Sequence, residues 1–132
     1  MEIIIEGIPH LNQEELKAIV DDPLHPAIVI DVREPEEYIA GHIPAVPLIP
    51  IGQIADYIDR FDKDIPYVFV CQSGIRSLRV AQFFQAHGFA RVYNFAGGMK
   101  TWKGDIAFGP ENIVTSFNPE QLSRKGRREG GA

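Results

Sequence analysis

The chain has 132 residues, 45% of them hydrophobic, which suits one folded domain and argues against a disordered chain. Its net charge of −5 argues against general binding to nucleic acid or to a membrane surface. A single cysteine excludes an internal disulfide and a cysteine-rich zinc cluster, and it favours a reducing, cytoplasmic compartment.

The N-terminal part of the chain predicts a capped helix followed by a buried strand. Its acidic start does not resemble a signal peptide. Asn12, with Glu15 three residues later, has the pattern of a capping box, and the helix that it opens ends before Pro23. Residues 27–32 are apolar and rich in β-branched side chains, as in a strand buried on both faces. Pro35 then suits the first turn of a short helix.

The middle of the chain predicts two further strands and a helix. Residues 46–49 are apolar but flanked by prolines, which places a short strand near an edge or an end of the sheet. Residues 51–58 bring their apolar side chains to one helical face. Residues 67–70 form a second buried strand, which leads directly into Cys71.

The next segments complete an alternation of strands and helices. Residues 76–87 predict a helix that Gly88 ends, residues 91–93 a third buried strand, and the surroundings of Trp102 a short helix. This alternation at short spacing predicts an α/β fold, with a mostly parallel central sheet and helices on both faces. We expect one domain over residues 1–108.

Residues 109–132 are predicted to be a C-terminal extension that is loose and locally basic. Pro, Asn, Ser and Gly are frequent in it, and four basic side chains lie near its end: Arg124, Lys125, Arg127 and Arg128. A solvated tail is the favoured interpretation, and contact with an acidic partner or RNA is the alternative.

The segment from Cys71 to Ser77 carries the chemistry. Cys71 follows the carboxyl end of a predicted parallel strand, where α/β folds place their ligands. Ser73 and Gly74 then form a tight turn into a helix, and the backbone N–H groups of such a turn favour an anion. Both effects favour a nucleophilic thiolate. An inert cysteine at the end of a core strand is the alternative.

These residues resemble the active-site loop of the rhodanese family, in which a cysteine opens a six-residue loop. Further family signatures follow in the same order: Asp31-Val32-Arg33-Glu34, Tyr38, Gly41-His42-Ile43-Pro44, Gly97-Gly98-Met99 and Trp102. The resemblance covers roughly residues 10–108, and the ordered combination is specific although each motif alone is weak. The match departs at Ala45-Val46, where the family usually has Gly-Ala.

The resemblance implies a sulfurtransferase of the thiosulfate type. Cys71 would take sulfane sulfur from thiosulfate or a persulfide as its own persulfide and pass it to a thiol or cyanide, and a protein acceptor is a further possibility. Arg76 would attract an anionic donor. The loop residues would bind substrate: Gln72, Ser73, Gly74, Ile75 and Ser77. The resemblance implies neither a metal nor a cofactor, and the oligomeric state stays open.

Asp31 and Arg33 have two interpretations. They end a predicted central strand, so they are candidates for a charge pair that supports the loop, and a purely structural ion pair is at least as probable a role. His42 is interpreted as part of a structural turn. The other three histidines (His10, His25 and His87) are expected at the surface, without ligand spacing.

Three rival functions follow from the same pattern. Cysteine phosphatases and arsenate reductases use a similar strand–loop–helix device, but they place five residues between Cys and Arg, whereas four separate Cys71 from Arg76 here. A smaller ring of N–H groups suits a single sulfur atom. A non-catalytic binding module usually lacks the cysteine, which is present. Delivery of sulfur to one protein partner stays open.

Overall fold

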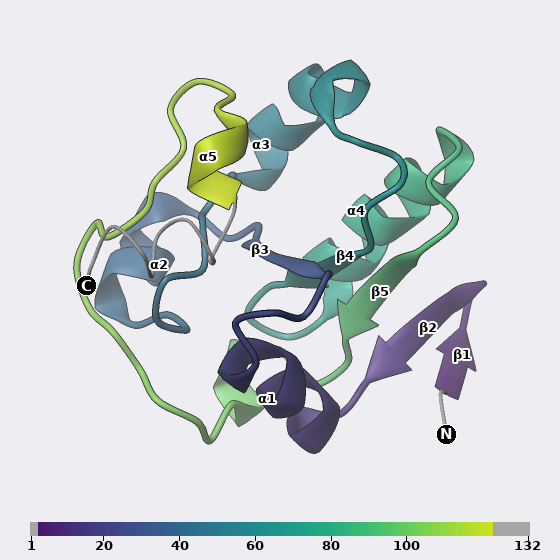
Figure 1. Cartoon of the computed structure of the whole chain (residues 1–132). Coiled ribbons are helices and arrows are strands. Elements are labelled where there is room, and N and C mark those ends of the chain that lie inside the picture. The colour runs from purple at the N-terminus through teal and green to yellow at the C-terminus, as the bar shows by residue number, and fades with distance from the viewer. Residues whose placement is uncertain (1–2, 123–132) are drawn as a thin grey trace.

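A five-stranded sheet forms the centre of the molecule in the computed structural model, which describes residues 3–122 (Figure 1). Its order is β1-β2-β5-β4-β3, with β1 antiparallel to β2 and the other three pairings parallel. The strands are β1 (Ile3–Ile5), β2 (Ile8–Leu11), β3 (Ile28–Asp31), β4 (Tyr67–Val70) and β5 (Val92–Phe95). The predicted mostly parallel α/β sheet is confirmed.

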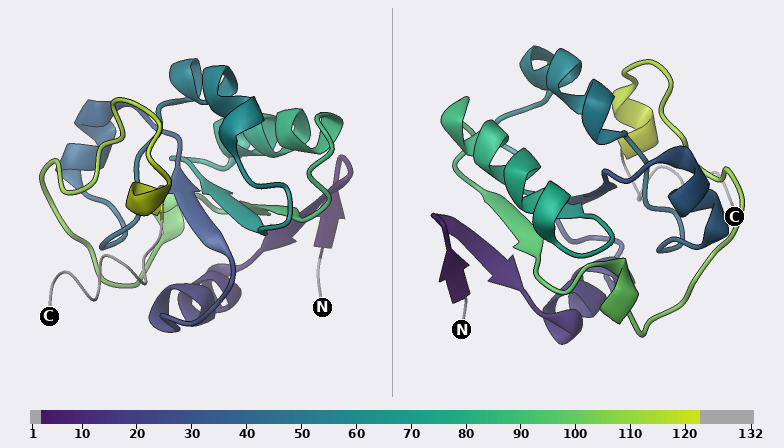
Figure 2. Two further views of the ribbon diagram at one scale, coloured as in Figure 1. Left: turned by 45° about the horizontal axis from the view of Figure 1, so that its top comes forward. Right: turned by 180° about the vertical axis from the view of Figure 1, so that it is seen from behind.

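Helices cover both faces of the sheet (Figure 2). The helices are α1 (Gln13–Asp21), α2 (Pro35–Ala40), α3 (Ile51–Ile54), α4 (Ile75–Ala86) and α5 (Pro119–Leu122), with two 3-10 helices, η1 (Ala55–Arg60) and η2 (Met99–Thr101). Leu16 of α1 packs with Val68 on one face, whereas Phe84 of α4 and Leu122 of α5 pack with Phe69 on the other. None of the described helices is long and apolar enough to cross a membrane.

Local sequence signals account for the start of two helices. The Asn12 side chain accepts a hydrogen bond from the Glu15 N–H (2.8 Å), and the Glu15 carboxylate accepts one from the Asn12 N–H (2.9 Å). The predicted capping box is therefore present and satisfies N–H groups that the first turn of α1 leaves without acceptors. Pro35 opens α2, where its missing N–H costs nothing.

Two sequence predictions were wrong in detail. Residues 46–49 form no strand: Leu48 makes only isolated bridges, to Asp31 and Ile113, because prolines on both sides prevent a longer ladder. The helix predicted over 51–58 is a single α-helical turn followed by the 3-10 helix η1.

The β1–β2 hairpin was not predicted. Pro9 lies inside β2, and a proline interrupts most strand patterns. It is accommodated because the pairing of β2 with β5 starts only at the next residue, His10.

The C-terminal extension packs against the domain as far as residue 122. Val114 and Leu122 are buried, and Leu48 exchanges backbone hydrogen bonds with Asn112 and Val114 (2.9 and 3.0 Å). The expectation of a loose segment from Gly109 is therefore corrected for residues 109–122, whose apolar side chains fill the core beside β3. Residues 123–132, which hold the four basic side chains, lie outside the described residues.

Candidate active site

The Cys71 loop begins at the carboxyl end of β4, between β3 and β5 in the sheet. Gly74 ends the loop as the N-cap of α4 with φ of +89°, a conformation that side chains rarely adopt. A Cβ on Gly74 would lie 2.4 Å from the carbonyl oxygen of Ala96. Only glycine therefore fits at this turn.

Hydrogen-bond donors converge on the sulfur of Cys71. The N–H groups of Gly74 and Ser77 donate to Sγ (3.1 and 3.3 Å), and the Ser77 hydroxyl oxygen lies 3.2 Å from it. The N–H groups of Ile75 and Arg76 are in the first turn of α4, where a helix offers no acceptor of its own. The site thus combines donors to the inner sulfur with further donors for an anion beside it.

Cys71 itself is fully buried in this conformation. The loop residues above it differ in exposure: Gln72 and Ser73 are half-buried, and Ile75 is 60% exposed. The Cys71 sulfur is therefore closed off from solvent in this conformation.

A second turn, which contains Gly98 and Met99, is hydrogen-bonded to the Cys71 loop and holds it in place. The Met99 N–H donates to the Cys71 carbonyl (2.7 Å), and the Lys100 N–H donates to the Gln72 carbonyl (3.1 Å). A Cβ on Gly98 would lie 2.4 Å from that Gln72 carbonyl oxygen, so glycine is required for this close approach. The Gly97-Gly98-Met99 signature is explained by this contact with the cysteine loop.

Asp31 and Arg33 form a buried ion pair that reaches the loop. Arg33 Nε and Nη2 donate to the Asp31 carboxylate (2.9 to 3.1 Å), and both residues are at most 3% exposed. Burial raises the pKa of Asp31, and the hydrogen bonds from Arg33 oppose that rise. Arg33 Nη1 also donates to Gln72 Oε1 (3.1 Å) and Nη2 to the Gly41 carbonyl (2.7 Å). The pair joins the loop to the Gly41 turn.

Arg76 forms a bidentate ion pair with Glu37. Its Nη1 and Nη2 donate to the two carboxylate oxygens (2.9 and 2.8 Å). The hydrogen bonds from Arg76 lower the pKa of Glu37 to about 2, so both partners of the pair are charged at neutral pH. An open cavity of about 460 Å³ lies beside this pair, lined by Arg33, Glu37, Ala40, Gly41, Gln72, Met99 and Ile106. The positive charge of Arg76 is thus largely balanced by Glu37 beside this cavity.

Sequence reasoning missed Asn94 and Glu37. Asn94, on β5, is fully buried, and it accepts a hydrogen bond from the Ser77 hydroxyl while its Nδ2 donates to the Gly74 carbonyl (3.0 Å). The available signal was a polar residue two positions after Val92 in a buried strand, where alternation predicts an inward side chain. No comparable signal marks Glu37.

The histidines differ in burial and in their contacts. His42 is buried, stacks on the Tyr38 ring (centroids 3.7 Å apart) and lies 3.0 Å from Glu111 Oε1, which agrees with a structural turn. His10 is only 8% exposed, which corrects the expectation of a surface position. His87 is exposed as expected. Among residues 3–122 no group of His, Cys, Asp or Glu is arranged to hold a metal ion.

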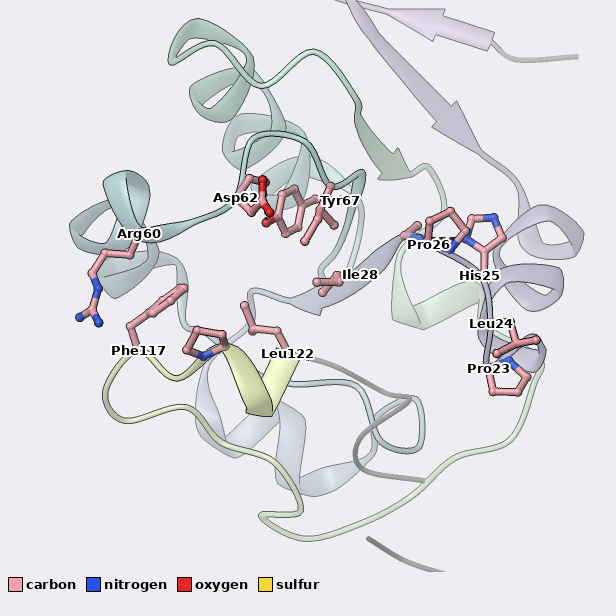
Figure 3. Close-up of a pocket in the computed structure, with 13 residues that line it drawn as sticks. Pro23, Leu24, His25, Pro26, Ile28, Arg60, Asp62, Tyr67, Phe117 and Leu122 are labelled. Carbon is pink, nitrogen blue, oxygen red and sulfur yellow. Dashed lines mark hydrogen bonds between the residues drawn. The ribbon is translucent and has the colours of Figure 1, made fainter. Parts of the chain in front are cut away.

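A second cavity, of about 570 Å³, is shown in Figure 3, and no residue of the Cys71 loop lines it. Ile28 and Tyr67, which start β3 and β4, line it together with Phe117 and Leu122 of the C-terminal segment. It therefore lies toward the opposite ends of the strands from Cys71, and it contributes no residue to the site.

The family model for the rhodanese-like domain matches residues 12–105. This chain belongs to the rhodanese-like domain family. The matched segment contains the cysteine loop, the Asp31–Arg33 pair and the Gly98 turn. The predicted resemblance is thereby confirmed.

Relatives of this rhodanese-like chain carry sulfurtransferase names. A putative sulfurtransferase, YtwF of Bacillus subtilis (strain 168), is 44% identical over 77 residues, which cover 58% of this chain and 74% of that protein. The thiosulfate sulfurtransferase GlpE of Pseudomonas entomophila (strain L48) is 36% identical over 77 residues, 58% of this chain and 71% of that one. The crystal structure of a rhodanese-like domain protein from Staphylococcus aureus has a TM-score of 0.67 and 32% identity, and covers 75% of this chain and 96% of that chain. The family and these relatives support sulfur transfer in general.

Proposed function

We propose that the protein moves sulfane sulfur from thiosulfate or a persulfide donor to a thiophilic acceptor, through a persulfide on Cys71. The observation that carries this proposal is the convergence of the Gly74 and Ser77 N–H groups on the Cys71 sulfur. Donors in this arrangement stabilise negative charge on a sulfur atom and on a second sulfur bound to it.

The proposed reaction has two steps, the loading of sulfur onto Cys71 and its transfer to an acceptor. The Cys71 thiolate attacks the sulfane sulfur of thiosulfate, the S–S bond of thiosulfate breaks, and sulfite leaves with the bonding electron pair. Cys71 then holds a persulfide anion. A thiolate or cyanide attacks the outer sulfur, which regenerates the Cys71 thiolate. A covalent intermediate of this kind predicts ping-pong kinetics.

The position of Arg76 also argues against the phosphatase alternative. A phosphate cradle needs an arginine that points into the ring of N–H groups, whereas Arg76 points to Glu37 with both of its Nη atoms. The loop is also one residue shorter between Cys71 and Arg76 than a phosphatase loop. A single sulfur atom is the better match to this site.

Replacement of Cys71 tests the proposed function. Cys71→Ser and Cys71→Ala remove the only cysteine thiol of the chain, so both should abolish thiosulfate–cyanide sulfur transfer. Circular dichroism and thermal unfolding serve as the control, because the variants should stay folded. Sulfur transfer that persists in either folded variant would contradict the proposal.

A further inference from the structure

The Ser77 hydroxyl has two hydrogen-bond partners but one proton. Its Oγ lies 3.2 Å from Cys71 Sγ and also within hydrogen-bond distance of Asn94 Oδ1. All three residues are fully buried, so bulk water does not compete for these atoms. The direction of this one O–H bond decides which neighbour it satisfies.

The amide of Asn94 has a defined orientation. Its Nδ2 donates to the Gly74 carbonyl oxygen (3.0 Å), which can only accept. Oδ1 must therefore face Ser77, where it too can only accept. The Ser77 hydroxyl is the donor that satisfies it.

This arrangement distinguishes the two protonation states of Cys71. In the thiol state, S–H can donate to Ser77 Oγ while the Ser77 O–H donates to Asn94 Oδ1, so every group is paired. When Cys71 loses its own proton to solvent, the sulfur can only accept. The Ser77 O–H then either turns to the sulfur and leaves Asn94 Oδ1 without its donor, or stays with Asn94 and gives the thiolate no third donor.

We propose that Asn94 is a positioning residue that acts through the Ser77 hydroxyl and holds Cys71 toward its neutral form. In the sulfur transfer proposed above, on which this role rests, Asn94 sets the fraction of protein that holds the attacking thiolate. Once the persulfide has formed, the negative charge lies mainly on the outer sulfur. Ser77 can then donate to Asn94 again, so the network favours the sulfur-loaded protein over the free thiolate.

Other charged or titratable groups around the site are the same in all variants of the double-mutant cycle. They are Arg76 on α4, Glu37 on α2, Asp31 and Arg33 at the end of β3, Lys100 in η2, and His10 on β2, which is paired in register with Asn94. Each of these side chains is present in every variant of the cycle, so its direct effect on the sulfur cancels in the comparison. A shift in the ionisation of Cys71 that depends on both Asn94 and Ser77 therefore comes from the Ser77 hydroxyl.

The test is a double-mutant cycle on the ionisation of Cys71. Asn94→Val suits a buried strand and removes the acceptor, which leaves the Ser77 hydroxyl free to donate to the thiolate. The pH midpoint of thiolate ultraviolet absorbance, measured against Cys71→Ser as blank, should fall by about one unit, the effect of one buried hydrogen bond. In the Ser77→Ala background the same replacement should shift the midpoint little.

Two outcomes would overturn the proposal. One is an unchanged midpoint in Asn94→Val. The other is an equal shift with and without the Ser77 hydroxyl, which would assign the effect to the lost bond with the Gly74 carbonyl. Asn94→Ala gives the same cycle if the valine variant does not fold. Since no sulfur donor is used, this test can fail while sulfur loading of Cys71 succeeds, and the reverse also holds.

Discussion

The floor and the rim of the Cys71 site are built differently. The floor consists of Asp31, Arg33, Ser77 and Asn94, which are all buried and hydrogen-bonded to one another or to the loop. The rim consists of Glu37, Arg76 and Ile75, which are about one-third to 60% exposed. Removal of one partner from a buried polar pair lowers the free energy of unfolding strongly, whereas removal of one partner from an exposed ion pair lowers it little. The floor should therefore control stability and the state of the sulfur, and the rim the choice of donor.

The largest effect on stability is expected in the floor. Arg33→Met leaves the buried Asp31 carboxyl without its partner, which should lower the free energy of unfolding by about 3–5 kcal/mol. Urea unfolding monitored by circular dichroism measures it. The double variant Asp31→Asn/Arg33→Met is the control, because it removes the uncompensated charge and should recover part of the loss. A cost below about 1 kcal/mol for Arg33→Met would mean that the pair behaves like an exposed one.

Smaller effects, on KM, are expected in the rim. Arg76→Ala should raise the KM for thiosulfate a few-fold, because Arg76 no longer balances the charge of Glu37, which then repels the dianion. Glu37→Gln should lower that KM, because the charge of Arg76 is then no longer balanced. Steady-state assays with thiosulfate and with a neutral sulfane donor measure both changes. Equal changes for the two donors would point to a structural role for the pair.

His10, on β2 next to β5, is a buried polar group without a hydrogen-bond partner in residues 3–122, unlike the paired groups of the floor. Its two ring nitrogens have no hydrogen-bond partner among the described residues, and burial lowers its pKa below the usual 6.5. The unfolded chain therefore binds a proton at His10 more readily than the folded protein does. As the pH falls below 6.5, this difference should lower the stability of the fold, by at most about 1.4 kcal/mol per pH unit.

Urea unfolding at neutral and mildly acidic pH tests the role of His10. His10→Leu should lose less stability on acidification than the wild type does. His87→Gln is the matched control, because that side chain is exposed, and it should keep the wild-type dependence. The same loss in wild type and His10→Leu would show that other groups cause the acid sensitivity.

Much of the fold was predictable because its signals are local. The Asn12–Glu15 capping box and the apolar runs of β3 and β4 specify their elements within a few residues. The position of Cys71 follows from the strand that it ends. The hairpin β1–β2 was missed because the three isoleucines of β1 are all exposed at the sheet edge. The strand therefore lacks the alternation of apolar and polar residues that marks a half-buried strand in a sequence.

Which polar side chains pair with one another in the site depends on contacts between distant residues, and this pairing was not predictable. Glu37 and Arg76 are 39 residues apart, and Ser77 and Asn94 are 17 apart. Only the packing of α2 and β5 around the loop brings them together. The Ala45 turn is a mixed case: the resemblance marked a glycine position, and the structure shows Ala45 with φ of +68°, a left-handed conformation that glycine adopts more readily.

Intact-mass spectrometry shows whether Cys71 carries one sulfur atom. Incubation with thiosulfate should add about 32 Da at Cys71, and cyanide should then remove that mass. The adduct should persist through desalting, because the N–H groups of Ile75 and Arg76 in the first turn of α4 are available to stabilise the negative charge of the outer sulfur. An aryl phosphate assay on the same sample tests the rival chemistry. Absence of the sulfur adduct, together with Cys71-dependent turnover of the aryl phosphate, would contradict sulfur transfer through Cys71.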